Sequence, residues 1–80
     1  MELANKTAFI TGGASGLGLA TARNFVEAGA NVCLYDMNAE SLELAAKEFG
    51  SKAICFRGDV ADEASVKEAI KETISSFASK

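Results

Sequence analysis

The feature that most constrains this sequence is a regular alternation of short apolar runs with longer stretches of helical periodicity. The apolar runs are Thr7–Ile10, Asn31–Tyr35 and Ala53–Phe56, and a helix-like stretch follows each of them. Strands that alternate with helices in this way pair in parallel and are joined by right-handed crossovers. Each run is apolar at successive positions, which is typical of strands covered on both faces. The order β-α-β-α-β-α therefore predicts an α/β fold with three layers.

Polar residues and glycines mark the ends of the three expected helices. The first covers Ser15–Ala28 and stops at Gly29. The second follows Asn38 as its N-cap and continues to Phe49, and Asp62 caps the third. Residues at helical spacing are expected to face the core, and they are Leu42, Phe49, Val66, Ile70 and Phe77.

Length and charge exclude several classes of protein. A chain of 80 residues holds at most one domain, and we expect residues 1–80 to form part of a single one. The formal charge of −3 provides no basic surplus for a nucleic-acid backbone. The apolar runs are too short to cross a membrane, and the start of the sequence shows no secretory signal. We therefore expect neither a nucleic acid nor a membrane as a partner.

The two cysteines indicate a reducing environment. Cys33 and Cys55 lie in apolar runs and are too few for a disulfide scaffold, so we expect buried free thiols. The cytoplasm fits this best, with the mitochondrial matrix as the alternative. The sequence has no histidine and no Cys-x-x-Cys pair, so no metal site is expected.

The most informative stretch is Thr-Gly-Gly-Ala-Ser-Gly-Leu-Gly, from Thr11 to Gly18, between a predicted strand and a predicted helix. Gly12 permits a tight turn, Gly16 allows the backbone to approach a bulky anion, and Gly18 allows the helix to pack closely on the sheet. The first turn of a helix has unpaired N–H groups and a dipole that favours negative charge. A pyrophosphate therefore fits this end without any lysine or arginine.

Three other interpretations of this loop can be tested residue by residue. A P-loop requires a lysine after its last glycine, and Leu19 stands there. A nucleophile elbow requires Gly-x-Ser-x-Gly, and Leu17 occupies the position of its second glycine. A glycine turn without a ligand is disfavoured by Asp36, which lies 18 residues beyond Gly18, where a dinucleotide fold has an acid.

Asp36 is the expected partner of the adenosine ribose, because its carboxylate can accept hydrogen bonds from the hydroxyls. The same charge would repel the 2′-phosphate of NADP. Two unit charges about 4 Å apart in an effective dielectric of about 20 repel by roughly 4 kcal/mol, on the order of a thousandfold in affinity. Ala14 and Met37 stand where a basic residue would offset this repulsion. The predicted cofactor is therefore NAD rather than NADP.

These residues resemble the short-chain dehydrogenase/reductase family, whose loop Thr-Gly-x-x-x-Gly-x-Gly matches Thr11 to Gly18 at every fixed position. The resemblance implies a partial Rossmann-like parallel sheet with strand order 3-2-1. It implies that Ser15 and Leu17 contact the cofactor, that the Asp59 carboxylate faces the adenine amino group, and that the Val60 backbone meets the ring edge. The complete set of expected cofactor-binding residues is Gly12, Ser15, Gly16, Leu17, Gly18, Asp36, Asp59 and Val60.

The resemblance covers only the first part of a typical family member. The catalytic pair Tyr-x-x-x-Lys is absent, because the only tyrosine is Tyr35 and Ala39 stands four places later. We interpret the chain as an amino-terminal fragment of an NAD-dependent alcohol or carbonyl oxidoreductase, without catalytic residues and inactive alone. The intact enzyme is then implied to act on a small-molecule substrate and to form a dimer or tetramer. Without a fourth strand, Thr7–Ile10 becomes an exposed edge of the sheet.

Two other functions stay open. A non-catalytic nucleotide-binding module would apply if the 80 residues were a complete product. A methyltransferase that uses S-adenosylmethionine also has a glycine loop before an acidic strand end, but its usual Gly-x-Gly-x-Gly spacing differs from that of Gly12, Gly16 and Gly18.

Overall fold

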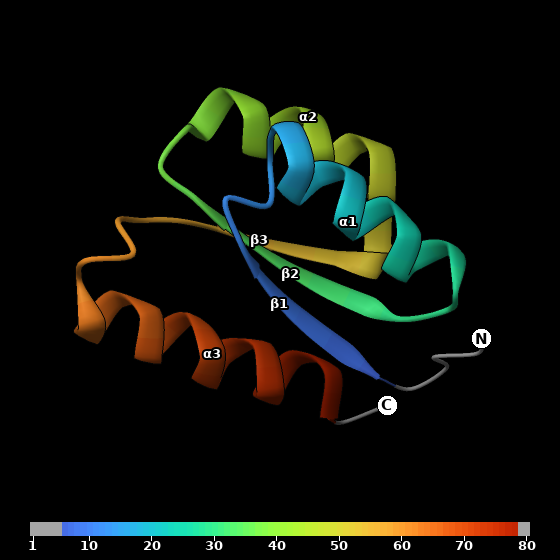
Figure 1. Ribbon diagram of the computed structural model, residues 1–80. Helices are drawn as coiled ribbons and strands as arrows, with labels where there is room; N and C mark the ends of the chain where they lie inside the picture. The colour runs from blue at the N-terminus through green and yellow to red at the C-terminus, as the bar shows by residue number, and fades with distance from the viewer. Residues whose placement is uncertain (1–5, 79–80) are drawn as a thin grey trace.

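A computed structural model describes residues 6–78 and contains three strands and three α-helices in the predicted alternating order (Figure 1). The predicted boundaries are correct to within one residue. Among the residues described, no helix is long and apolar enough to cross a membrane. The elements are β1 (Thr7–Thr11), α1 (Gly16–Glu27), β2 (Asn31–Asp36), α2 (Ala39–Phe49), the 3₁₀ turn η1 (Gly50–Lys52), β3 (Ala53–Arg57) and α3 (Glu63–Ala78).

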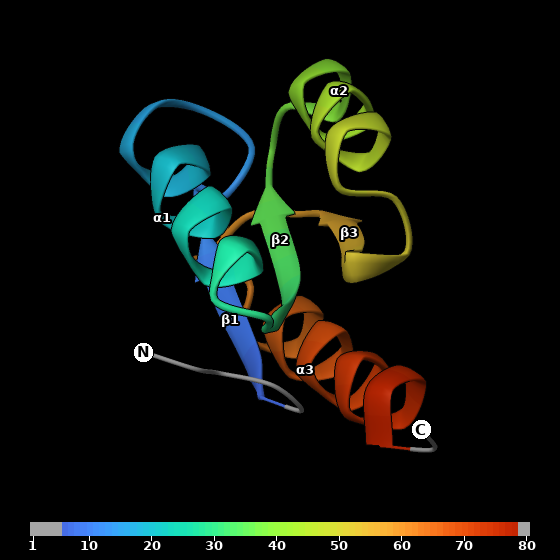
Figure 2. The same ribbon diagram turned by 90° about the vertical axis from the view of Figure 1, so that its right-hand side faces the viewer.

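The strands form one parallel sheet in the order β1-β2-β3. Helices α1 and α2 cover one face of this sheet and α3 covers the other (Figure 1), and the view in Figure 2 shows β2 between its two neighbours. The three-layer Rossmann-like fold and the strand order 3-2-1 are thus confirmed. All three strands end at the same edge of the sheet, where Thr11 pairs in register with Tyr35, and Asp36 with Arg57.

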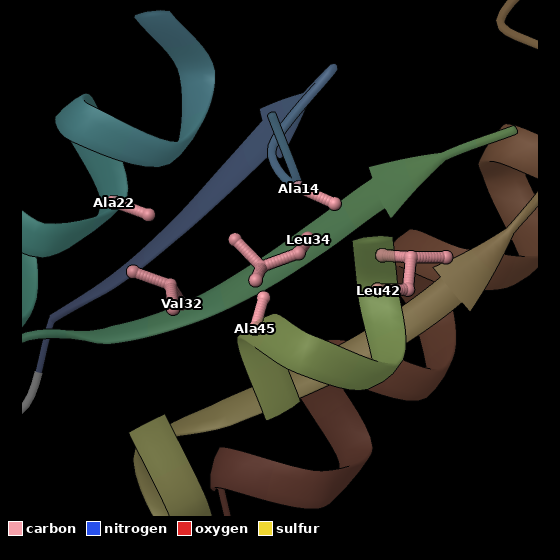
Figure 3. Packing of buried hydrophobic residues seen from close by; sticks show 6 residues of the cluster. All are labelled: Ala14, Ala22, Val32, Leu34, Leu42 and Ala45. Carbon is pink, nitrogen blue, oxygen red and sulfur yellow. The ribbon is translucent and has the colours of Figure 1, made fainter. Parts of the chain in front are cut away.

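Strand β2 forms the centre of the hydrophobic core. Residues 32–35 are fully buried, and Val32 and Leu34 point toward α1 and α2 (Figure 3). Small and aliphatic side chains pack around these two residues, namely Ala14, Ala22, Leu42 and Ala45. Leu42 is buried as predicted, whereas Phe49, Val66 and Phe77 are half-buried.

The helix ends carry the residues that the sequence predicts. Gly29 terminates α1, and its N–H donates to the Val26 carbonyl at 3.0 Å, one of the bonds of a Schellman motif. The Asn38 side chain accepts the N–H three residues further on at 3.0 Å and so caps α2. Asp62 does the same for α3 at 3.1 Å. The two side-chain caps satisfy donors that the helices themselves leave unpaired, and the Gly29 N–H satisfies a carbonyl acceptor.

Helix α3 packs on the sheet through a different face from the one predicted. Ala69 and Thr73 are buried, and Thr73 lies beside Cys33 of β2. Ile70 is 39% exposed and Ile74 is 63% exposed, so the prediction that Ile70 belongs to the core is wrong. The small side chains at positions 69 and 73 let the helix approach β2 closely, which turns the next residue in each case away from the sheet.

Both cysteines are free thiols, but only Cys33 is buried as expected. Cys33 is buried, and Cys55 is half-buried with its Sγ donating to the Leu42 carbonyl at 3.7 Å. Burial raises the pKa of each thiol above its ordinary value. The raised pKa disfavours the thiolate, which is the reactive form of a cysteine.

Replacing a buried leucine should cost far more stability than replacing an exposed one. Leu34→Ala would leave a cavity beside β2 and should lower the free energy of unfolding by about 2–5 kcal/mol. Leu44→Ala makes the same chemical change on α2, where the side chain is 68% exposed, and should cost less than about 0.5 kcal/mol. Urea unfolding of the full chain measures both values, and equal losses would contradict the packing described.

Because β1 lies at an exposed edge of the described sheet, we expect copies of the isolated 80-residue chain to associate with one another. Strand β1 pairs only with β2 in the described sheet, so one row of its backbone groups can pair with another chain. The exposed Ile70 and Ile74 add apolar surface. We expect a poorly stable or oligomeric species whose mass in analytical ultracentrifugation rises with concentration. A monomer with a sharp two-state melt at every concentration would refute this expectation.

Candidate functional site

The carboxyl ends of the three strands surround an open cleft of about 350 Å³. Ligands of open α/β sheets bind outside this end of the strands, so its position already favours a binding site. The residues that line it come from all three strand ends and are Thr11, Gly12, Tyr35, Asp36, Met37, Gly58 and Val60. Three of the expected cofactor residues therefore lie in one cleft, namely Gly12, Asp36 and Val60.

The glycine loop between β1 and α1 has a left-handed backbone at two positions. Gly12 has φ +65° and Gly16 has φ +56°, and a Cβ at either position would meet no atom within 4 Å. Residues with side chains avoid this region at a cost of about 1–2 kcal/mol. The N–H of Gly12 donates to the Tyr35 carbonyl at 2.7 Å, which ties the turn to β2. The tight turn after the first strand is thus where the sequence predicts it.

Two other glycines of the loop are required by space. A Cβ on Gly18 would overlap the carbonyl oxygen of Gly12, so the close approach that Gly18 permits is to the loop itself rather than to the sheet. A Cβ on Gly13 would come within 2.8 Å of the Ile10 carbonyl oxygen and 2.9 Å of the Leu34 side chain. The requirement for Gly13 was not predictable from the motif, because this contact depends on how the loop folds back over β2.

Helix α1 begins four residues after Gly12 of the cleft and leaves donors without a helical partner in its first turn. The residues that start it, Ser15 to Gly18, are not among those that line the cleft. Its first internal hydrogen bond runs from the Leu19 N–H to the Ser15 carbonyl at 3.3 Å, so the N–H groups of residues 16–18 have no partner within the helix. In the described part of the chain, the Ser15 side chain forms no capping hydrogen bond. Ser15 and Gly16 are exposed, and Leu17 is 84% exposed. An anion at this helix end would meet backbone donors and the positive end of the dipole.

The Asp36 carboxylate joins the glycine loop to the end of β2. Its Oδ2 accepts the Ala14 N–H at 3.2 Å, and its Oδ1 accepts the Asn38 N–H at 3.0 Å. The salt bridge found within residues 6–78 lies elsewhere, between Arg23 and Glu48, so Asp36 is held by backbone donors and not by a cation. Each carboxylate oxygen has a further lone pair, which a ligand hydroxyl can use.

The loop after β3 forms the opposite wall of the cleft. Val60 lines the cleft and is exposed. Asp59 lies in an adjoining hollow of about 260 Å³, and its Oδ1 accepts the Ala61 N–H at 2.9 Å. Met37 and Gly58 border both spaces. The structure therefore brings the two candidates of this loop to the same end of the sheet as Asp36, although Asp59 faces the neighbouring hollow.

Arg57 is a charged neighbour of the site that the sequence analysis missed. It is the register partner of Asp36 at the end of β3, and it lines the hollow that contains Asp59. Its Nε donates to the Met37 carbonyl at 3.2 Å, and the side chain is exposed. Arg57 is the last residue of β3 and belongs to no recognisable motif. Its position beside Asp36 follows from the pairing of β2 with β3.

The acidic and thiol side chains of the described residues are dispersed. Within residues 6–78, no three His, Cys, Asp or Glu side chains gather closely enough to hold a metal ion. Tyr35 also borders the cleft, but its side chain is fully buried and its hydroxyl is hydrogen-bonded to the Asp59 carbonyl and the Ser65 Oγ. The arrangement offers backbone N–H groups to an anion and carboxylate oxygens to hydroxyl groups.

Comparison with known families agrees with this geometry. Residues 6–79 match the family model described as short chain dehydrogenase. The chain belongs to the short-chain dehydrogenase family. The family assignment made from the glycine loop and the strand ends is thereby confirmed.

Relatives of this short-chain dehydrogenase chain are named as dehydrogenases. It is 42% identical over 76 residues to 2,5-dichloro-2,5-cyclohexadiene-1,4-diol dehydrogenase of Sphingobium indicum, with 95% of this chain and 30% of the relative covered. It is 39% identical over 79 residues to sorbitol dehydrogenase of Cereibacter sphaeroides, with 99% of this chain and 31% of the relative covered. The chain thus spans about a third of the length of these relatives.

Solved structures of the same family superpose closely. A short-chain dehydrogenase/reductase from Brucella melitensis, described as glucose/ribitol dehydrogenase, gives a TM-score of 0.89 at 28% identity, over 96% of this chain and 33% of that one. A 3-ketoacyl-(acyl-carrier-protein) reductase from the same organism, complexed with NADH, gives a TM-score of 0.87 at 35% identity, over 94% and 31%.

Removing one acceptor oxygen from Asp36 should destabilise the loop junction. Asp36→Asn retains one oxygen and places an NH₂ group against the second backbone donor, so we expect a loss of about 1–3 kcal/mol in the free energy of unfolding. Asp62→Asn is the matched control, because its cap uses one oxygen and Asn caps helices as well as Asp. Urea unfolding should show a change below about 0.5 kcal/mol for the control. If the two variants lost the same free energy of unfolding, the second backbone contact of Asp36 would contribute nothing to stability.

Proposed function

We propose that this chain binds NAD and supplies the adenosine and pyrophosphate half of the cofactor site of an oxidoreductase. The observation that carries the proposal is the position of Asp36, whose carboxylate is fixed to the glycine loop by the Ala14 N–H while it lines the cleft. Pyrophosphate would bind the N–H groups at the start of α1 together with the Ser15 hydroxyl. The ribose hydroxyls would donate to Asp36.

The remaining candidates have roles that follow from their places. Gly12 and Gly16 keep the loop free of side chains where the diphosphate would lie, and Gly18 lets the helix lie close against the loop. The exposed Leu17 would cover the diphosphate from outside. The adenine ring would lie between Met37 and Val60, with the Asp59 carboxylate beside its amino group. The NADH complex of the related 3-ketoacyl reductase supports a nicotinamide cofactor in this fold.

Bound NAD would accept or deliver a hydride, and the chain's own residues would bind and orient its adenosine end. The Tyr-x-x-x-Lys pair is absent from this sequence, so we propose that residues 1–80 are the amino-terminal part of one dinucleotide-binding domain and are inactive alone. The intact protein would oxidise an alcohol or reduce a carbonyl of a small molecule. We further propose that the intact protein is a homodimer or homotetramer. We also propose that it is cytoplasmic, which the free thiols support.

The charges near the ribose favour NAD over NADP. Asp36 would repel a 2′-phosphate by roughly 4 kcal/mol at about 4 Å, whereas Arg57 has the opposite sign and would offset part of that repulsion. We therefore expect a preference for NAD of between about tenfold and a thousandfold.

Calorimetric titration of the full chain with NAD and with NADP tests this preference. Arg57→Gln should weaken NADP binding further, by about three- to tenfold, and leave NAD binding nearly unchanged. Arg23→Gln is the control, since Arg23 lies in α1 and pairs with Glu48 away from the cleft. Equal affinity of the unmodified chain for the two cofactors would defeat the proposed preference. Displacement of bound ligand by S-adenosylmethionine, and not by NAD, would defeat the proposed function.

A further inference from the structure

We infer that Tyr35 is a positioning residue that holds the loop after β3 in place for the adenosine part of the cofactor, an inference that rests on the proposed function. Tyr35 is fully buried in β2, directly before Asp36. Its hydroxyl donates to the Asp59 carbonyl at 3.1 Å and is hydrogen-bonded to the Ser65 Oγ at 2.8 Å. One phenol group thus connects the central strand to both ends of the segment that carries Val60.

The loop backbone lies directly on the tyrosine side chain. A Cβ on Gly58 would overlap the Tyr35 hydroxyl and would lie 2.8 Å from the Ser65 Oγ. The Gly58 N–H also donates to the Asp36 carbonyl at 3.0 Å, which continues the sheet bonding into the loop. The path of the chain out of β3 is therefore set by the position of the tyrosine.

Tyr35 and Asp36 act on the two walls of the cleft from opposite faces of the sheet. Successive residues of a strand point to opposite sides, so the two side chains diverge. Asp36 accepts the Ala14 N–H of the glycine loop, and Tyr35 donates to the Asp59 carbonyl of the other loop. The end of β2 thereby fixes both loops at once, and the width of the cleft between them depends on both contacts.

The Tyr35 hydroxyl is one of two donors to the Asp59 carbonyl, so its removal should loosen the loop only moderately. The Asp59 carbonyl accepts the Asp62 N–H at 2.9 Å as well, so it keeps one partner when the tyrosine hydroxyl is lost. The Ser65 Oγ then loses its link to β2. The loop should stay folded and become more mobile, rather than unfold with the whole domain.

Tyr35→Phe in the full chain tests this inference by two measurements. Amide hydrogen exchange without ligand should become about tenfold faster at Ala61 and Asp62, the change expected for one hydrogen bond of about 1.4 kcal/mol. Exchange at Ala14, which Asp36 holds, should not change. Affinity for adenosine 5′-monophosphate should fall by about three- to tenfold.

Two serine variants on α3 provide the comparison. Ser65→Ala removes one partner of the hydroxyl and should give a smaller change in the same direction, and Ser75→Ala changes an exposed serine of the same helix and should give none. Equal acceleration at all slowly exchanging amides, with unchanged nucleotide affinity, would overturn the inference, because it would show a general loss of stability. If the unmodified chain binds neither NAD nor adenosine 5′-monophosphate, the proposed function fails. Unchanged loop exchange in Tyr35→Phe would instead refute the role of Tyr35.

Discussion

Strand β2 is bonded on both edges and covered on both faces, and the rest of the structure depends on that confinement. It pairs with β1 and β3, and residues 32–35 are fully buried. A strand in this position has no freedom to slide, because a shift of one residue would exchange Leu34 and Tyr35 between the faces of the sheet. The end of β2 is therefore an accurate reference point for the loops around it.

The loops of the candidate site are held to the end of β2 mainly by hydrogen bonds of backbone groups, and less by charged side chains. The Tyr35 carbonyl accepts the Gly12 N–H, the Asp36 carboxylate accepts the Ala14 N–H, and the Asp36 carbonyl accepts the Gly58 N–H. These bonds are made by groups whose positions follow from the sheet itself. A chain with a formal charge of −3 can in this way present a site for an anion, since oriented N–H groups replace the lysine or arginine of other phosphate sites.

The sequence predicts the parts of this structure that depend on local patterns. The strands, the helix caps at Asn38 and Asp62, and the turn at Gly12 each follow from a few neighbouring residues. The packing face of α3 was not predictable in this way, because small residues at 69 and 73 decided it against the larger Ile70. The parallel order of the strands followed from the alternation and the family resemblance together.

Contacts between distant residues account for what the sequence analysis missed at the site. Tyr35 meets Ser65 across 30 positions, and Arg57 lies beside Asp36 only through the pairing of β2 with β3. Gly13 lies in the loop before α1 and is confined by Leu34, which belongs to β2. No periodicity or motif encodes such pairs. They become visible only when the sheet is assembled, and they include the residues that we propose to tune the site.

The two contacts of the Asp36 carboxylate have a consequence for attempts to re-engineer cofactor choice. Under the proposed function, exchanging Asp36 for a small neutral residue would remove the charge that repels a 2′-phosphate. Here that exchange would also leave the Ala14 N–H without its acceptor and loosen the loop that is meant to hold the diphosphate. A redesign that keeps the loop intact would have to supply a new acceptor for that amide.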